Sequence, residues 1–176
     1  MSVKCWRLNK EVVLLSLLEW CLRKCSVDRL LVVNRCDSEL PRRTPLYPES
    51  VRQTERIFSG IIIDNLFATA WPGSELIGHS ALVYRIGFHS GVVNSMAEVS
   101  HSLWTWNHNH EPSLPEDLCL YRSGSRWPTL VTVTHEQDGW IIWENVDDLP
   151  WATRDVVSPK DLLIPEAKSP EFLVPA

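Results

Sequence analysis

The chain has 176 residues, of which 44% are hydrophobic and 22% charged, a composition typical of one globular domain and not of a disordered chain. Its formal net charge of -5 argues against non-specific binding to nucleic acid, because that binding needs concentrated Lys and Arg. The charge is uneven: residues 1–56 carry eleven Lys/Arg against seven Asp/Glu, whereas residues 57–176 carry six against fifteen. The acidic second part would attract a cationic partner, or it would simply keep the surface solvated.

The chain contains five cysteines and no Cys-x-x-Cys pair, which favours a reduced cytoplasmic protein over a disulfide framework. They are Cys5, Cys21, Cys25, Cys36 and Cys119. Cys21 and Cys25 are one helical turn apart and could share a metal ion, but packing in the core is the simpler expectation. The apolar run near the N-terminus is interrupted by Glu19 and is shorter than the roughly 20 residues of a membrane span, so no membrane association is expected.

The first 35 residues predict a helix followed by a strand. Residues 10–25 place apolar side chains at helical spacing, and Asn9 is positioned to cap the start of that helix. Residues 29–35 contain a β-branched pair and predict a short buried strand. Residues 36–50 hold three prolines and predict a loop after this helix–strand unit, residues 1–35.

Residues 50–66 fit a helix and a strand almost equally. We expect a helix from about Glu49 that weakens near Gly60, because charged residues fill its first turns. A turn should follow at Pro72-Gly73, then a strand over 81–88. Ser90 begins a third helix, and His101 lies off its apolar stripe, facing solvent.

Three short strands are predicted next, over residues 117–122, 129–134 and 140–143, joined by the turns SGSR and HEQDG. The predicted fold class is therefore α+β: a single domain with an antiparallel β-meander packed against two or three helices. Residues 51–145 would form the main sheet and helices. The proline-rich residues 146–176 would form an extended arm laid over the body, with a mobile tail as the alternative.

The segment Asn107–Glu111 contains the residues most suggestive of chemistry. In an extended conformation His108 and His110 would point the same way and could share a metal ion, with Glu111, Asp117 or His135 completing the shell. No complete catalytic or metal motif is present, so we expect no cofactor. A metal-dependent hydrolase using His108, His110 and His135 stays an alternative function.

His135 and Cys119 raise two further possibilities. His135 could work as an acid or base paired with Glu116 or Asp117, or it could only hydrogen-bond its own hairpin. Cys119 could be a nucleophile with His135 as its base. Its place in the apolar alternation LCLY predicts a buried, inert thiol instead.

Six of the nine tryptophans cluster in the sequence around the predicted meander, and the core of a chain this size cannot hold all of them: Trp104, Trp106, Trp127, Trp140, Trp143 and Trp151. Trp and Tyr are enriched in interface hot spots, so a recognition surface is expected. Trp106 and Trp127 lie in or beside loops and are predicted to be exposed. One of Trp140 and Trp143 should face the core, because the two are on a strand.

Three short motifs resemble an uncharacterised family of small bacterial cytoplasmic proteins over residues 66–143. They are Trp71-Pro72-Gly73, Pro115-Glu116-Asp117-Leu118-Cys119 and Thr134-His135-Glu136. By analogy, small acidic α+β proteins of this kind include immunity proteins, which block a toxin made by the same cell.

These observations predict a non-catalytic protein-binding module, most simply an immunity-type inhibitor of a basic toxin domain. A structural subunit of a larger assembly, with the apolar first helix as its contact, is a further alternative. The predicted partner-binding residues share an acidic, Trp-bearing surface: Trp106, His108, His110, Glu111, Glu116, Asp117, Trp127, His135, Glu136 and Asp138.

Overall fold

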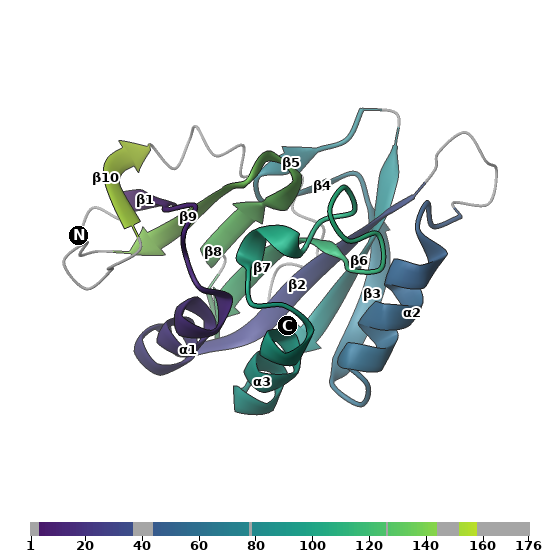
Figure 1. The fold of residues 1–176 in the computed structure, drawn as a ribbon, viewed down its shortest axis with the longest axis horizontal. Helices are drawn as coiled ribbons and strands as arrows, with labels where there is room; N and C mark the ends of the chain where they lie inside the picture. Colours follow the sequence, from purple (N-terminus) through teal and green to yellow (C-terminus); the bar gives the residue numbers. More distant parts are fainter. Residues whose placement is uncertain (1–3, 37–43, 78, 126, 144–151, 158–176) are drawn as a thin grey trace.

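The fold is an eight-stranded sheet with helices packed on one face (Figure 1). The computed structural model describes residues 4–36, 44–77, 79–125 and 127–143, and the backbone of 152–157. Its strand order is β10-β1-β9-β8-β7-β2-β6-β3, with every pair antiparallel. The helices are α1 (Leu14–Cys25), α2 (Pro48–Ile57) and α3 (Ser90–Val99). The strands are β1 (Lys4–Leu8), β2 (Val27–Cys36), β3 (Ile62–Ala68), β4 (Ala70–Trp71), β5 (Ser74–Glu75), β6 (Ser80–Gly87), β7 (Glu116–Arg122), β8 (Pro128–Val133), β9 (Asp138–Trp143) and β10 (Ala152–Val157).

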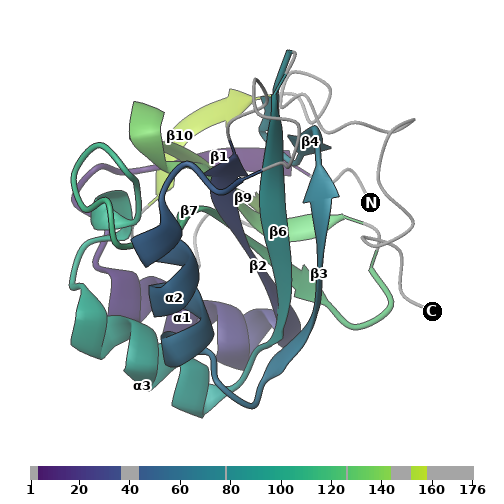
Figure 2. The same ribbon diagram turned by 90° about the vertical axis from the view of Figure 1, so that its right-hand side faces the viewer.

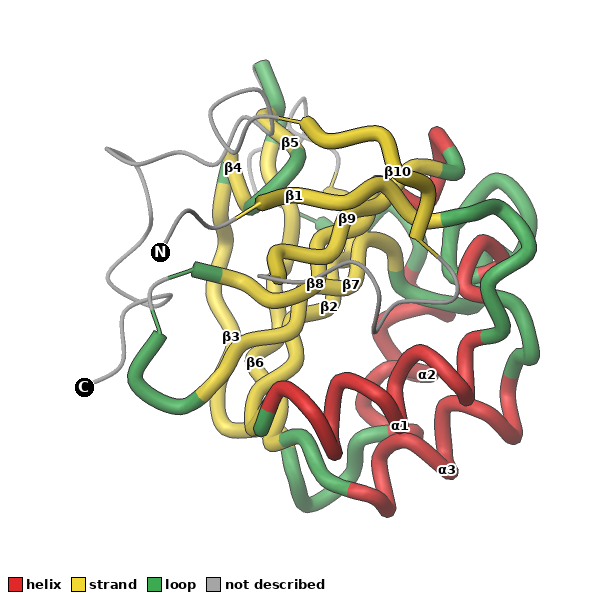
Figure 3. Tube along the Cα trace, turned by 90° about the vertical axis from the view of Figure 1, so that its left-hand side faces the viewer, coloured by secondary structure: helices red, strands yellow, loops and turns green. Residues whose placement is uncertain are grey.

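The layers confirm the predicted α+β fold. Figure 2 and Figure 3 show the three helices together on one side of the sheet, and the small β4–β5 hairpin away from them. The predicted meander is present as β7–β8–β9. The predicted strand 29–35 is longer, Val27–Cys36, and lies in the middle of the sheet between β7 and β6.

Helix α1 fills the core on the helix side. Its apolar stripe is buried as predicted: Leu14, Leu17, Leu18, Cys21 and Cys25. Burial of each such side chain contributes roughly 1.5–3 kcal/mol.

The predicted start of this helix is wrong. It begins at Leu14 and not at residue 10, because the Asn9 side chain accepts the N–H of Glu11 (2.9 Å) in a preceding turn. Residues 4–8 form strand β1, which lies between β9 and β10. Asn9 therefore stabilises a turn that joins β1 to α1 and caps no helix.

The opposite face of the sheet carries a second buried cluster, over which the β4–β5 hairpin packs. The turn predicted at Pro72-Gly73 joins these strands, and Trp71 is only 1% exposed. Gly73 has φ +86°, and a Cβ there would lie 3.0 Å from side-chain carbons of both Val131 and Val133. Glycine is required for the turn and for the close approach to β8.

Residues 50–66 form a helix and a strand in succession, so the prediction of one helix is right only for its first half. Helix α2 ends at Ile57, and Gly60 takes φ +77° in the turn that follows. The isoleucine-rich segment then becomes β3, paired with β6. Its β-branched side chains favour an extended backbone once a neighbouring strand is available.

The core takes two of the six tryptophans that cluster around the meander, Trp104 and Trp106, and three from elsewhere in the chain. Among the eight described tryptophans, the core takes five: Trp6, Trp20, Trp71, Trp104 and Trp106. Trp140 and Trp143 are half-buried, and Trp127 is 44% exposed. Trp151 lies outside the described residues.

The predictions of a C-terminal arm and of no membrane association are tested only in part by the described residues. Within residues 146–176 the described part is β10, whose backbone pairs with β1; the rest of the predicted arm lies outside the described residues. No helix in the described ranges is long and apolar enough to cross a membrane.

Candidate functional site

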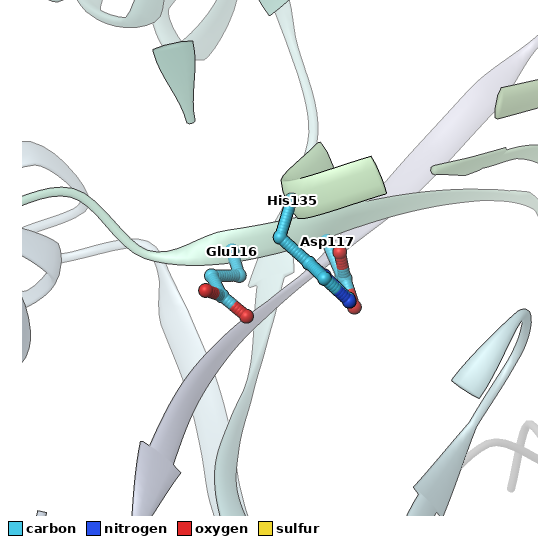
Figure 4. Close-up of side chains that lie close together, drawn as sticks. All are labelled: Glu116, Asp117 and His135. Carbon is cyan, nitrogen blue, oxygen red and sulfur yellow. The ribbon is translucent and has the colours of Figure 1, made fainter. Parts of the chain in front are cut away.

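The three motifs that carried the family resemblance meet at one end of the sheet. We call it the network end: β2 finishes there at Cys36, β7 starts at Glu116, and the 3-10 turn Thr134–Glu136 joins β8 to β9. The Trp71 indole, the Glu116-Asp117 pair and His135 all lie there. Figure 4 shows His135 reaching across β7 with its ring beside the Asp117 carboxylate.

Asp117 is fully buried, and each of its two carboxylate oxygens accepts two hydrogen bonds. Trp71 Nε1 (2.9 Å) and Ser74 Oγ (3.2 Å) donate to Oδ2, while the Thr134 backbone N–H (2.8 Å) and hydroxyl (3.3 Å) donate to Oδ1. Burial and the neighbouring Glu116 raise the pKa of Asp117, against the lowering effect of the Thr134 and Trp71 hydrogen bonds. Asp117 therefore ties the β4–β5 hairpin and the β8–β9 turn to the first residues of β7.

The backbone at Asp117 has φ +45°, in the left-handed region. Asp is one of the residues that tolerates this conformation, at a strain of order 1–3 kcal/mol. The β2–β7 pairing also slips between Leu31 and Val33, beside this point. The irregular backbone lets adjacent Glu116 and Asp117 both be buried near His135.

Glu116 is held by charged partners. Its carboxylate lies 2.6 Å from Nε of Arg35 and 3.1 Å from Nδ1 of His108. Burial by itself raises the pKa of Glu116, but its interaction with His108 and the positive charge of Arg35 outweigh it, so the pKa lies below its usual range. Glu116 is thus an ionised, buried anchor for Arg35.

Arg35 also donates to His135, because Nη2 lies 3.1 Å from Nδ1 of that ring. A guanidinium has no acceptor, so Nδ1 must accept and the ring proton lies on Nε2. The Arg35 side chain is 32% exposed, whereas that of Glu116 is 2% exposed. Arg35 is therefore the one member of this ion pair that reaches solvent.

Glu116, Asp117 and His135 present ligand atoms within 4.8 Å of one another, a spacing that a metal ion could bridge. The Arg35 guanidinium already contacts two of them. A divalent cation would have to displace that charge and compete with four donors on Asp117. The cluster holds its own cation, so its geometry favours a structural ion-pair network over a metal centre.

His108 lies deeper, under the start of α2. Tyr47 stacks on its ring, with centroids 4.0 Å apart, and Nε2 is 3.3 Å from Ser50 Oγ. Ser50 donates in turn to the buried Asn34 side chain of β2. Nδ1 is close to Glu116 but is not aligned for a hydrogen bond. His108 therefore fastens α2 to the network.

The predicted extended segment 107–110 is a tight turn, which corrects the histidine metal hypothesis. The Asn107 side chain accepts the N–H groups of Asn109 (2.9 Å) and His110 (3.1 Å). His108 is consequently buried, while His110 is exposed and lies 3.5 Å from Gln137. Among the described residues, His108, His110 and His135 do not form a common ligand group.

Several of the predicted partner-binding residues are not at the surface. Trp106 was expected to be exposed and is 0% exposed, packed against Phe58 with ring centroids 6.4 Å apart. His108, Glu116 and Asp117 are also buried. Sequence reasoning placed them in a loop and at a strand start, and neither position reveals that other segments cover them.

The remaining predicted residues stay accessible in different degrees. Glu111, His135 and Asp138 are half-buried, and His110 and Glu136 are exposed. Asp138 forms an ion pair with Arg7 of β1. Whether any of them binds a partner stays a prediction.

Trp127 lies at the opposite end of the sheet from the others. We call this the hairpin end: it contains the β7–β8 turn, and β8 separates it from Thr134 by six residues, or roughly 20 Å. Arg122, the last residue of β7, also lies at this end. One acidic surface bearing both predicted tryptophans does not exist.

Cys119 cannot serve as the nucleophile considered from the sequence. It is 0% exposed, its Sγ lies 3.8 Å from the Pro72 carbonyl, and burial raises its pKa well above the usual range. The predicted burial of this thiol is confirmed. All five cysteines are buried and free.

Sequence reasoning missed three members of the network that lie before Trp71 in the chain: Asn34, Arg35 and Ser50. One signal was present: a buried Glu-Asp pair at a strand start requires a nearby cation. Which cation supplies it depends on the β2–β7 pairing across 81 positions of sequence, which no local pattern specifies.

No protein-family model, no curated protein and no solved structure matches this chain.

Proposed function

We propose that this chain is a non-catalytic protein-binding module that uses the network end as its contact surface. The proposal rests on one observation: the buried carboxylates there already have hydrogen-bond and ion-pair partners within the chain. Glu116 and Asp117 are buried and already bonded to Arg35, Trp71, Ser74 and Thr134. A general acid, base or nucleophile needs access to substrate, whereas a rigid buried network suits a preorganised recognition surface.

The exposed residues around the network would make the contact; we call them the rim, meaning Leu46, Ile77, His110 and Glu136. Ile77 is 92% exposed and Leu46 is 49% exposed, so two large aliphatic side chains of the rim face solvent. The backbone N–H of Leu46 donates to the Arg35 carbonyl (2.8 Å), so this loop is tied to the end of β2. Apolar residues beside charged ones are the composition of a protein interface.

For the partner we propose a basic protein, with a toxin domain as the finer hypothesis. The Glu136 side chain is 65% exposed, and its one ionic contact among the described residues is His135, 3.8 Å away. Together with the acidic balance of residues 57–176, this carboxylate would steer a cationic partner towards the rim. The immunity role itself rests on the resemblance of the three motifs, and Arg35 and the buried acids would act by holding the rim in place.

The test is affinity capture from the native cells, followed by light scattering of the purified complex. We expect a stoichiometric complex with one partner rich in Lys and Arg. Ile77→Asp and Glu136→Lys should each abolish it. The matched controls are Ile63→Asp, on the edge strand β3, and Glu98→Lys, on α3, because both residues are exposed and distant from the rim.

Two outcomes would contradict the proposal. One is the recovery of no stoichiometric partner from cells that express the chain at its natural level. The other is a complex that survives both rim substitutions, or that the control substitutions disrupt equally. Circular dichroism of each variant would verify that it is folded.

A further inference from the structure

The hairpin end presents a cationic surface, although the chain as a whole is acidic. Arg23 and Arg29 are paired with carboxylates, at 2.9 Å and 3.3 Å respectively. Three further cations there are exposed and form no ion pair with a described residue: Lys4, Lys24 and Arg122. The surplus of positive charge therefore faces solvent at this end.

Arg122 borders a shallow, open depression formed between the end of α1 and the β7–β8 turn. The depression is lined by Ser26, Arg122, Ser123, Gly124 and Ser125. The Arg122 guanidinium lies over the Trp143 ring, 5.8 Å from its centroid, and this cation–π contact restrains it. A restrained arginine among serine hydroxyls is a suitable receptor for an oxyanion.

The exposed Trp127 adjoins this depression, because it is hydrogen-bonded to Ser125. The Trp127 N–H donates to Ser125 Oγ (3.1 Å), and that hydroxyl donates back to the Trp127 carbonyl (2.8 Å). Its side chain is the most exposed of the described tryptophans, at 44%. Trp and Arg are among the residues most enriched at the positions that contribute most of the binding energy in protein interfaces.

We propose that the hairpin end binds an acidic segment of a protein partner. A carboxylate of that segment would sit in the depression and pair with Arg122, while an apolar side chain beside it packs on Trp127. Charge complementarity selects the partner, since unpaired cations meet its carboxylates. Three cations on a chain of net charge -5 are too few to hold a nucleic-acid backbone, which favours a peptide.

This inference does not depend on the proposed function. The rim and the hairpin end lie at opposite ends of the sheet, and substitutions at one leave the other intact. A failure of the capture experiment would not affect peptide binding here, and the reverse also holds. If both surfaces bind, the chain would bring a basic and an acidic partner together.

The experiment is a titration of the full ¹⁵N-labelled chain with the peptide Glu-Asp-Glu-Leu-Asp-Glu, followed by amide and indole chemical shifts. We expect shifts confined to the Ser26 and Arg122–Ser125 amides and the Trp127 indole. Arg122→Glu should raise the Kd about tenfold and Trp127→Ala about threefold, as for loss of one charge pair and one aromatic contact. The control Arg52→Glu, an exposed arginine of α2, should leave the Kd within about twofold.

Each other result would overturn the proposal. Shifts spread over the surface, or a Kd weakened equally by Arg52→Glu, would mean non-specific attraction. Binding of the peptide Lys-Arg-Lys-Leu-Arg-Lys with equal affinity at the hairpin end, seen as shifts of the same amides, would remove the role of charge. Tighter binding of an oligodeoxythymidine at physiological salt would make the surface a nucleic-acid site. The spectrum of each variant shows directly whether it is folded.

Discussion

The two ends of the sheet use the same residue types in opposite ways. At the network end, Arg35 forms an ion pair with Glu116, whose side chain is 2% exposed, and donates a hydrogen bond to the ring of His135. At the hairpin end, Arg122 is exposed, contacts the Trp143 ring, and forms no ion pair with a described residue. Burial of its partner makes the first arginine structural, and exposure leaves the second available for recognition.

The difference has a quantitative basis. Removing one partner of a buried ion pair strands the other charge in a poorly solvated place and costs about 3–5 kcal/mol. An exposed pair contributes about 0–1 kcal/mol, because water solvates either partner alone. Substitutions at the two ends should therefore separate into stability effects and binding effects.

The largest expected effect is that of Asp117→Ala. The change leaves the Trp71 indole N–H, the Ser74 hydroxyl and the Thr134 N–H without their acceptor at a buried position. We expect a loss of about 4 kcal/mol in the free energy of unfolding, measured by urea denaturation. The matched control is Asp28→Ala at the hairpin end, an exposed carboxylate that should cost less than about 0.5 kcal/mol. Equal losses would refute the contrast between the ends.

The next largest expected effect is the difference in stability between the variants Arg35→Met and Arg122→Met. Methionine keeps most of the side-chain volume and removes the charge, so Glu116 loses its cation while Trp143 loses only a surface contact. The unfolding free energy should fall by about 3 kcal/mol for Arg35→Met and by less than about 1 kcal/mol for Arg122→Met. A stable Arg35→Met protein would show that the network does not need its cation.

The acid pair predicts a pH dependence that Glu116→Gln would isolate. At about pH 7 this variant should be about 2 kcal/mol less stable than the natural chain, since Arg35 keeps part of its hydration. The folded pKa of Glu116 is lowered, so its stabilisation is full above the ordinary value of 4.5 and is lost as pH falls through the folded pKa.

Asp117 acts with the opposite sign in the same range. Its folded pKa is raised above 3.8, so its contribution is full below that value and is lost as pH rises through the folded pKa. Because Glu116 itself raises the pKa of Asp117, this contribution is removed by comparing Asp117→Asn with the double variant Asp117→Asn/Glu116→Gln. We expect the difference in stability between these two variants, from urea titrations at several pH values, to be constant above 4.5 and to shrink below it. A difference that stays constant through this range would mean that folding does not lower the pKa of Glu116.

The smallest expected effect reports the field at the hairpin end. Iodide, an anionic quencher, should concentrate beside Arg122. Trp127 should therefore account for a larger share of the fluorescence quenching by iodide than of the quenching by neutral acrylamide. Trp127→Phe should therefore lower the overall iodide quenching constant by a larger fraction than the acrylamide constant. An unchanged ratio would show that no positive potential acts there.

Sequence reasoning succeeded where a local pattern specifies the structure. The stripe of α1 and the alternation of β7 to β9 follow from periodicity, and the turn at Pro72-Gly73 follows from residue chemistry. It failed at Asn9, whose side chain accepts a hydrogen bond within a turn and caps no helix. It also failed at β3, where the sequence fits a helix and a strand equally and pairing with β6 stabilises the strand.

The same distinction between local pattern and tertiary contact applies to the candidate site. The sequence by itself placed Glu116, Asp117 and His135 near one another, because a hairpin brings a strand start and a turn together. Only the tertiary structure placed Arg35 between them, buried Trp106 and moved Trp127 to the other end of the sheet. These outcomes depend on strand order and on contacts between distant segments, which short-range periodicity does not encode.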